Sequence, residues 1–216
     1  MKNWSKTRKL MLCTALLIVS LFFIVSISNW RSPTLNIAIR RAEKQQLIGP
    51  SEIIATMDFQ FSPWDHLVLG KTEHGFITYE YIDSLGWDNG DLKYYAMEKG
   101  CTIFCTEYHY RTGEEEWLPI FLFPKDPWSA EAEMTLTITV DGETRHYALT
   151  GERNDSSYYL FRQPTEEMGG QHFWLLQQAL TGAYSEYVLS GTVEIQIDFF
   201  DRSGNLVDTY SKTVTK

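Results

Sequence analysis

Residues 134–149, MTLTITVDGETRHYAL, combine a strict alternation of apolar and polar side chains with a turn signal. Such a period of two is typical of a strand with one face in a core and the other in solvent. Asp141-Gly142 suits a two-residue hairpin turn, because both of its positions accept positive φ. The segment therefore predicts an antiparallel hairpin whose inward side chains are Met134, Leu136, Ile138 and Val140.

The same alternation returns near the C-terminus, where threonine, acidic and amide side chains separate Val193, Ile195, Ile197 and Phe199. SSYYLFR at 156–162 favours a further strand, and QHFWLLQQAL at 171–180 favours a helix that Gly182 ends. Paired strands of this kind suit an immunoglobulin-like β-sandwich. We expect residues 129–216 to form that sandwich, with the helix inserted in it.

Upstream, PKDPW at 124–128 is the best candidate for a linker. Before it, short strand-like runs alternate with turn-like breaks, a pattern that predicts an antiparallel meander. In the first run, IIATMDFQF (53–61), one side of a half-buried strand is expected to carry Ile53, Ala55, Met57, Phe59 and Phe61. Ser32-Pro33 favours the start of a helix that Gly49-Pro50 ends, with Leu35, Ala38, Ile39 and Ala42 on its apolar face. The charged residues Arg40, Arg41, Glu43 and Lys44 are expected mostly on the solvent side of this helix. Residues 32–123 are therefore expected to be a short helix packed on a meander.

The N-terminal part contains a run from Leu10 to Trp30 without a charged side chain. About 20 helical residues cross a bilayer core, whereas the apolar core of a cleaved signal has about 7–15. We therefore expect 10–30 to be a retained transmembrane anchor. Lys2, Lys6, Arg8 and Lys9 precede it, so 1–9 should be a cytoplasmic tail and the rest extracytoplasmic.

Two segments carry a resemblance. A lysine-bearing tail, one apolar span and AIRRAEKQQLIGPSEIIAT (38–56) resemble a loose group of uncharacterised membrane-anchored proteins of low-GC Gram-positive bacteria. DFFDRSGNLVDTYSKTV (198–214) resembles the terminal hairpin of bacterial immunoglobulin-like modules. The first resemblance implies a single-pass membrane protein, the second implies a sandwich, and neither implies an activity.

Charge sets limits on the partners of the chain. Of nineteen Lys and Arg residues four precede the apolar run, so fifteen remain against twenty-eight Asp and Glu and give a formal charge of −13. Such a balance argues against nucleic acid as a partner.

Two cysteines follow the anchor. In GCTIFCTEYHY, Cys101 and Cys105 lie four residues apart on an expected strand, about 13 Å from each other, whereas a disulfide needs Cα atoms within about 7 Å. We expect both thiols to be buried and unpaired.

No strong catalytic motif is present, so no catalytic, cofactor-binding or metal-binding residue is predicted, and no cofactor. Ser62, Asp65 and His66 contain the residue types of a triad, but three polar residues near a turn are commonly just the turn. Gly169-Gly170 before a helix could hold an anion, but a Gly-Gly pair is mainly a turn signal, and we expect a flexible entry to that helix. The five histidines, His66, His74, His109, His146 and His172, show no metal-ligand spacing.

Three functions therefore compete. A non-enzymatic module that binds another envelope protein is favoured. A wall-glycan module would need an exposed cluster from Trp64, Trp87, Trp117, Trp128 and Trp174, and an enzyme would need a pocket with Asp65 and His66. Glu114–Glu116, the densest acidic run, suits a solvated loop tip or a contact for a cationic partner.

We predict that the anchor is uncut, because its apolar run is longer than a signal core. Mass determination of the protein extracted from membranes should give the full-length value. A mature N-terminus near Asn29 would contradict the prediction.

Overall fold

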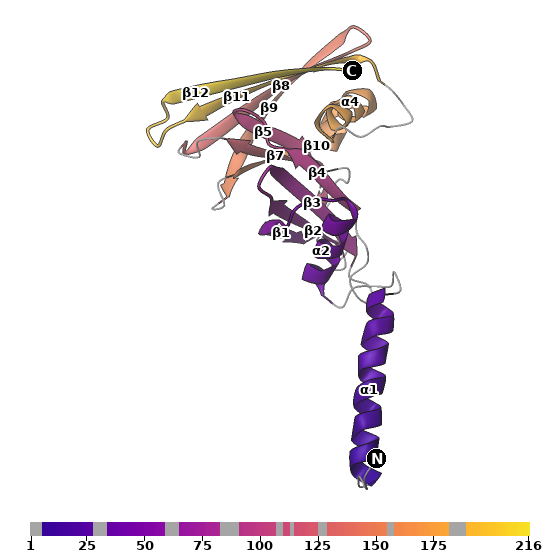
Figure 1. Ribbon diagram of the computed structural model, residues 1–216. Coiled ribbons are helices and arrows are strands. Elements are labelled where there is room, and N and C mark those ends of the chain that lie inside the picture. The colour runs from indigo at the N-terminus through magenta and orange to yellow at the C-terminus, as the bar shows by residue number, and fades with distance from the viewer. Residues whose placement is uncertain are drawn as a thin grey trace.

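The computed structural model describes residues 6–27, 34–58, 65–82, 91–106, 110–112, 115–124, 129–154, 158–181 and 189–216. It contains an isolated N-terminal helix and a body of two antiparallel sheets with further helices (Figure 1). The body is mostly β, as the alternating patterns predict.

Helix α1 (Lys6–Ile27) stands apart from the body and exposes its apolar side chains along its length. Within it, Lys6–Ile24 is long and apolar enough to span a membrane. The predicted anchor begins inside this helix at Leu10, whereas residues 28–30 lie outside the described part of the chain.

The first sheet is a four-stranded meander in the order β1-β2-β3-β4. Its strands are β1 (Glu52–Asp58), β2 (Asp65–Lys71), β3 (Gly75–Ile82) and β4 (Asp91–Ala96). Helix α2 (Leu35–Gln45) packs on one face, where Ala38, Ile39 and Ala42 meet a core that includes Val68, Ile77 and Tyr79. This part confirms the expected helix on a meander and its apolar helical face.

The ends of α2 differ from the prediction. The N-cap is Thr34, whose side chain accepts a hydrogen bond from Ile37 N, whereas Ser32-Pro33 lies outside the described residues. The helix ends at Gln45, before Gly49-Pro50, because Leu47 adopts the left-handed conformation at φ 57° and Ile48 N bonds back to Glu43 O. Glycine commonly occupies this left-handed position after a helix, and Leu47 occupies it here.

Glu43 was expected on the solvent side of α2, but it is 2% exposed. Its carboxylate accepts hydrogen bonds from Ser51 N and Ser51 Oγ and pairs with Arg40 at 2.8 Å, while Arg40 also donates to Ser51 O. A Cβ on Gly70 would lie 3.0 Å from Ser51 Oγ, so glycine provides the space for this group. The buried carboxylate thereby fixes α2 to the start of β1.

The second sheet has eight strands in the order β12-β11-β8-β9-β10-β7-β5, with β6 also paired to β7. Its strands are β5 (Cys101–Cys105), β6 (Tyr110–Thr112), β7 (Glu115–Pro124), β8 (Glu131–Val140), β9 (Glu143–Asn154), β10 (Tyr158–Pro164), β11 (Gly191–Phe200) and β12 (Leu206–Thr215). Helices α3 (Thr165–Met168) and α4 (Gly170–Thr181) connect β10 to the segment before β11.

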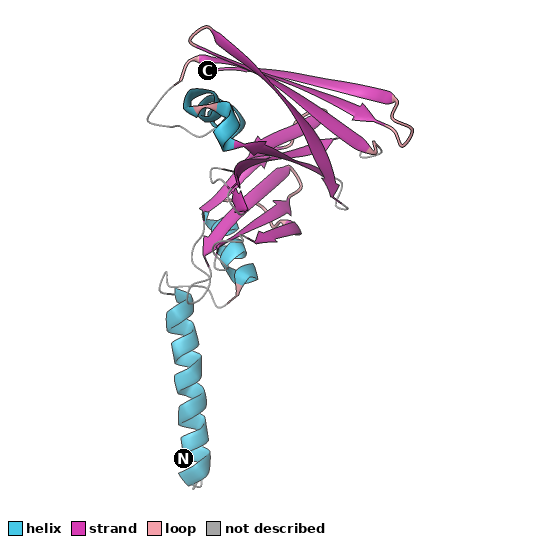
Figure 2. Cartoon of the chain, turned by 180° about the vertical axis from the view of Figure 1, so that it is seen from behind, coloured by secondary structure: helices cyan, strands magenta, loops and turns pink. Residues whose placement is uncertain are grey.

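The eight-stranded sheet turns a corner within β9. Residues up to Gly151 pair with β8, whereas Glu152, Arg153 and Asn154 pair with β10. A Cβ on Gly151 would lie 2.7 Å from the Phe161 ring, so glycine permits this close crossing. The half β12-β11-β8-β9 consequently curls over α4 and away from the half β10-β7-β5 (Figure 2).

Strands β5, β7 and β10 form a middle layer that is buried on both faces. One face, with Cys101, Ile103 and Leu118, joins a core with α4, β8 and β11. The other face brings Phe104, Phe121 and other aromatic side chains against Phe76 and Tyr95 of the first sheet. The layers in order are therefore α2, the meander, the middle layer, α4 and the curled half.

Several details of the strand predictions need correction. The meander was expected to reach Phe123, but β5, β6 and β7 belong to the eight-stranded sheet, so the sheets separate between β4 and β5. The proposed linker 124–128 lies mainly outside the described residues, and the division into domains at that point stays a prediction. An immunoglobulin-like sandwich is not confirmed, because one continuous sheet curls around a helix.

Strand β1 shows why its alternation was misjudged. Ile53, Ala55 and Met57 were expected on one side, but a register shift between Ile53 and Ala55 changes the phase. Ile54 therefore packs with Ala55 and Met57 against the aromatic core, and Ile53 is exposed. Phe59 and Phe61, assigned to the same side, lie outside the described residues.

The cysteine prediction is confirmed. Cys101 and Cys105 are buried and form no disulfide within the described residues, and they lie with Ile103 in the core that contains α4. Asp141-Gly142 also forms the expected turn, with φ values of 51° and 83°.

We predict that Ile197→Asp lowers the free energy of unfolding by at least about 3 kcal/mol, because Ile197 is fully buried and the carboxylate would find no partner there. Ala148→Asp is the matched control on the exposed face of β9, and it should cost less than about 1 kcal/mol. Urea denaturation of the full chain in detergent measures both. Equal losses would mean that the inner face of β11 is not core.

Candidate functional site

The described structure includes two residues of the candidate triad, Asp65 and His66. Ser62 lies outside the described residues, and Asp65 begins β2. The His66 ring stacks on the Tyr81 ring of β3 at a centroid distance of 4.9 Å, which is a packing contact across neighbouring strands. Across the described ranges, no three His, Cys, Asp or Glu side chains are grouped to hold a metal ion.

The other histidines are scattered. His74 lies in the exposed β2–β3 turn, His146 contacts Thr137 Oγ1 through Nδ1 on the outside of the curled half, and His172 contacts Glu143 O from α4. His109 lies outside the described residues. Each described histidine has a local structural contact, and these contacts do not converge.

The Gly169-Gly170 segment forms the entry to α4, with Gly169 at φ 67°. Arg145 donates to Met168 O beside it and pairs with Glu143 at 2.7 Å. The Glu143 carboxylate therefore already pairs with the Arg145 guanidinium. The Gly169-Gly170 segment leads into α4 and is fixed there by the hydrogen bond from Arg145 to Met168 O.

The tryptophans do not gather on the described surface. Trp117 is buried in the aromatic core with the Arg162 guanidinium 4.8 Å above its ring, whereas Trp174 on α4 is 49% exposed. Trp64, Trp87 and Trp128 lie outside the described residues. Of the acidic run, Glu115 and Glu116 begin β7 and Glu114 is not described, so the run sits at a strand start beside β6.

One cluster of titratable side chains was not predicted. Glu80 of β3 lies directly opposite Asp91 of β4, and Lys93 lies two residues further along β4 on the same face. This face is the one that packs on the middle layer, where Tyr95 Oη donates a hydrogen bond of 2.9 Å to Cys105 O. The charges therefore lie at the border of the contact between the two sheets.

Burial governs the protonation of this cluster. Desolvation, reinforced by the Asp91 carboxylate, raises the pKa of Glu80 to about 8, although Lys93 opposes the rise. Desolvation also lowers the pKa of Lys93 and raises the pKa values of the Tyr95 hydroxyl and the Cys105 thiol. At neutral pH Glu80 is mainly a neutral acid, which suits a carboxyl packed between two sheets.

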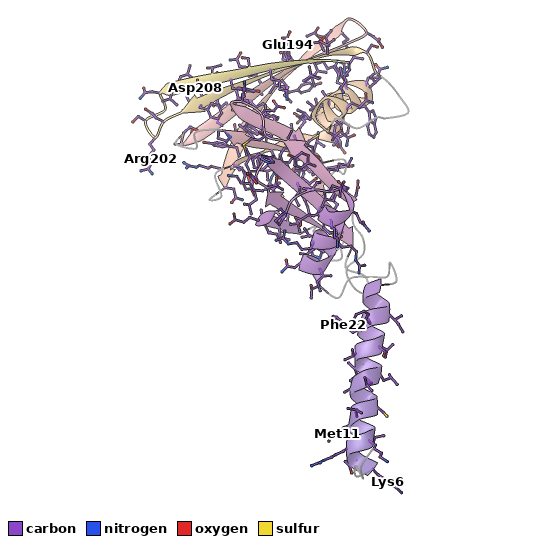
Figure 3. The ribbon with its side chains drawn as sticks, in the orientation of Figure 1. Lys6, Met11, Phe22, Glu194, Arg202 and Asp208 are labelled. Carbon is purple, nitrogen blue, oxygen red and sulfur yellow. The ribbon has the colours of Figure 1, made fainter. Side chains whose placement is uncertain are left out.

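A second feature that was not predicted is the outer face of the curled half, which we call the distal face. It is turned away from α4 and lies at the end of the molecule opposite α1, as Glu194 shows in Figure 3. Its side chains align in four cross-strand rungs over β12, β11, β8 and β9: Thr215-Thr192-Thr139-Thr144, Thr213-Glu194-Thr137-His146, Ser211-Gln196-Thr135-Ala148 and Thr209-Asp198-Glu133-Thr150.

The composition of the distal face is distinctive. Nine of its sixteen positions are threonine and one is serine, three are carboxylates, and Lys, Arg and aromatic residues are absent from it. Hydrogen bonds link neighbours along the rungs, as between Thr139 and Thr144 at 2.9 Å and between Thr209 and Asp198 at 2.7 Å. The face is therefore a broad, ordered array of hydroxyls with negative charge.

The fold and its surfaces define the chain as an antiparallel, mostly β protein with one helix of membrane-spanning length. Comparisons with models of protein families, with curated proteins and with solved structures found no match.

We predict a pH dependence from Glu80. Because its pKa is raised in the folded chain, the unfolded chain loses this proton first, and stability should fall as pH rises from about 4.5 through about 8. Glu80→Gln should be nearly neutral at pH 5 and stabilise by about 2–4 kcal/mol at pH 9, since one pKa unit corresponds to about 1.4 kcal/mol.

Glu194→Gln is the matched control, because its carboxylate is exposed on the distal face and it should change stability little at either pH. Urea denaturation at pH 5, 7 and 9 measures all three chains. If the free energy of unfolding of Glu80→Gln falls with pH as steeply as that of the wild type, the pH dependence does not come from Glu80.

Proposed function

We propose that the chain is a single-pass membrane protein of the cell envelope that binds another protein through its distal face. Helix α1 is the anchor, its N-terminal side is cytoplasmic, and the body is extracytoplasmic. The role is non-enzymatic. The distal face is the observation that carries this proposal, because it spans four strands and lies at the far end of the molecule from the anchor.

The anchor part rests on length and charge. Lys6–Ile24 has a mean hydropathy of 1.9, and the basic residues Lys6, Arg8 and Lys9 mark the side that stays in the cytoplasm. The apolar side chains that α1 exposes would contact the acyl chains of the bilayer. The body then begins within a few residues of the membrane, and the distal face is held away from it.

The chemistry of the distal face selects the kind of partner. Glu133, Glu194 and Asp198 supply negative charge, and no Lys or Arg stands among the rung positions. A protein surface rich in Lys, Arg and backbone donors complements this charge, and such complementarity gives specificity and faster association. The threonine hydroxyls donate as well as accept, so they can match polar groups of either kind.

The structure gives less support to a glycan module. Sugar rings are commonly bound by exposed aromatic side chains, and the distal face has none. Of the two described tryptophans, Trp174 on α4 is exposed, whereas Trp117 is buried in the aromatic core. We therefore keep protein binding as the proposal and treat glycan capture as an outcome that would contradict it.

We predict that a photo-crosslinking amino acid at Gln196, in the middle of the distal face, captures one protein partner in intact cells of the native host. The same amino acid at Thr56, which is exposed on β1 of the other sheet, serves as the control and should not capture it. Glu194→Lys in the Gln196 background should reduce the adduct roughly tenfold, because it repels a basic partner surface. The adducts are identified by mass spectrometry.

Two results would contradict the proposal. Equal adducts from Gln196 and Thr56 would mean that the distal face is not selective. If Gln196 crosslinks to glycan and to no protein, the chain is a glycan-binding module and the proposal of protein binding is wrong.

A further inference from the structure

Strand β12 leaves one edge of the eight-stranded sheet open. Among the strands that the structure describes, it pairs with β11 alone. Gly191 and Lys216 exchange both backbone hydrogen bonds, at 3.1 and 3.0 Å. Because inward and outward backbone groups alternate along an antiparallel strand, Thr209, Ser211, Thr213 and Thr215 direct their N–H and C=O groups away from β11.

An edge of this length is a template for another strand. Its inner side chains are Asp208, Tyr210 and Lys212, which lie opposite Phe199, Ile197 and Ile195 of β11. Asp208 and Lys212 carry opposite charges and stand at equal distances on either side of Tyr210. The edge is therefore complementary to itself under a two-fold rotation about Tyr210.

We propose that two copies of the chain pair through antiparallel β12 strands, with the two-fold axis at Tyr210. The two Tyr210 rings then lie opposite each other. Asp208 of each copy faces Lys212 of the second copy, and Thr209 of each copy exchanges backbone hydrogen bonds with Ser211 of the second. The inference deepens the proposed function and rests on its anchor, because the membrane brings the copies together.

Charge selects this register over its neighbours. A two-fold axis at Lys212 would place two lysines opposite each other, and like charges in that position destabilise a sheet. An axis at Ser211 would place Asp208 opposite Val214 and leave its charge without a partner. Lys212 already contacts Glu98 at 2.6 Å, and an ammonium group has three donors, so it can hold both carboxylates.

The orientation of the sheet agrees with two anchored copies. A two-fold axis that joins antiparallel edges into one sheet stands perpendicular to that sheet. The distal face of the sheet looks away from α1 (Figures 1 and 3), so the axis runs toward the anchor end. Both α1 helices consequently point to the same side and enter one membrane.

Pairing also enlarges the surface proposed for binding. The rung that contains Gln196 and Ser211 would continue into Thr209 and Asp198 of the second copy. The distal faces of both copies then form one continuous surface, twice as wide, with a two-fold axis in its middle. A partner with two-fold symmetry fits such a surface.

Disulfide trapping in native membranes tests the pairing. In a Cys13→Ser background, Tyr210→Cys places two thiols at a non-hydrogen-bonded pair, about 4.5 Å between Cα atoms, within disulfide range. It should give a dimer under mild oxidation. Thr215→Cys is the control, because its two copies would lie about 34 Å apart, ten residues along the strands.

A second probe avoids any loss of packing at Tyr210, which contacts the core. Cells that make both Thr209→Cys and Ser211→Cys chains should form the mixed dimer, since these residues would face each other across the axis. A thermal melt of each variant confirms that it is folded.

A charge exchange tests the register independently. Asp208→Lys alone and Lys212→Asp alone should each reduce the trapped dimer roughly tenfold, because each puts like charges opposite each other twice. The double exchange should restore the dimer.

Overturning results are equally definite. If Tyr210→Cys gives no more disulfide-linked dimer than Thr215→Cys, the proposed pairing is excluded. If Tyr210→Cys forms a disulfide with a different protein, that protein and not a second copy binds the β12 edge. Failure of the photo-crosslink from Gln196 together with successful trapping would reject the proposed function and leave the dimer in place. The opposite pattern would reject the dimer alone.

Discussion

The double burial of β5, β7 and β10 is the constraint on which the remaining structure depends. Each of these strands must satisfy an aromatic core on the side of the meander and an aliphatic core on the side of α4. Burial of apolar area is the main favourable contribution to folding, and here one layer serves two cores. The meander with α2 and the curled half with α4 are held in one body because both pack against this layer.

Pro119 shows how the layer accommodates a residue that lacks a backbone donor. It lies within β7 between the segment that pairs with β5, from Ile120 onward, and the segment that pairs with β6, up to Trp117. Among the described pairings, Pro119, which has no N–H to donate, therefore falls between the part of β7 paired with β5 and the part paired with β6.

Sequence patterns predicted the strands with one buried face well. Residues 134–140 and 193–199 alternate cleanly because one side of each is solvated, and their inward residues are those that the periodicity indicated. The middle layer carries no such signal, since side chains such as Ile103 and Phe104 are buried on opposite faces. The sheet to which β5 and β7 belong was therefore not predictable, because it depends on pairing with β10, which is distant in the sequence.

The site features were predictable to different degrees. The threonines of β8 were recognisable as a solvent face, but their alignment with Glu194 and His146 requires the registers of three strand pairs. The buried position of Glu80 was not predicted, although a single acid among the aromatic residues of GFITYEYI indicates burial or pairing. Glu43 was assigned to the solvent side because of its charge, although it lies eight residues after Leu35 on the stripe that helical periodicity buries. The sequence does not show that Ser51 and Gly70 form a space for its carboxylate.

The separation of the middle layer from the distal face also has an evolutionary consequence. A substitution in β7 must be compatible with two cores at once, so few are tolerated. The side chains of the distal face contact neither core, and many of them can change while the inward alternation of β8 and β11 is kept. A lineage that carries this fold can therefore change the charge and hydrogen-bonding groups of one sheet surface without a new solution to the packing of its interior.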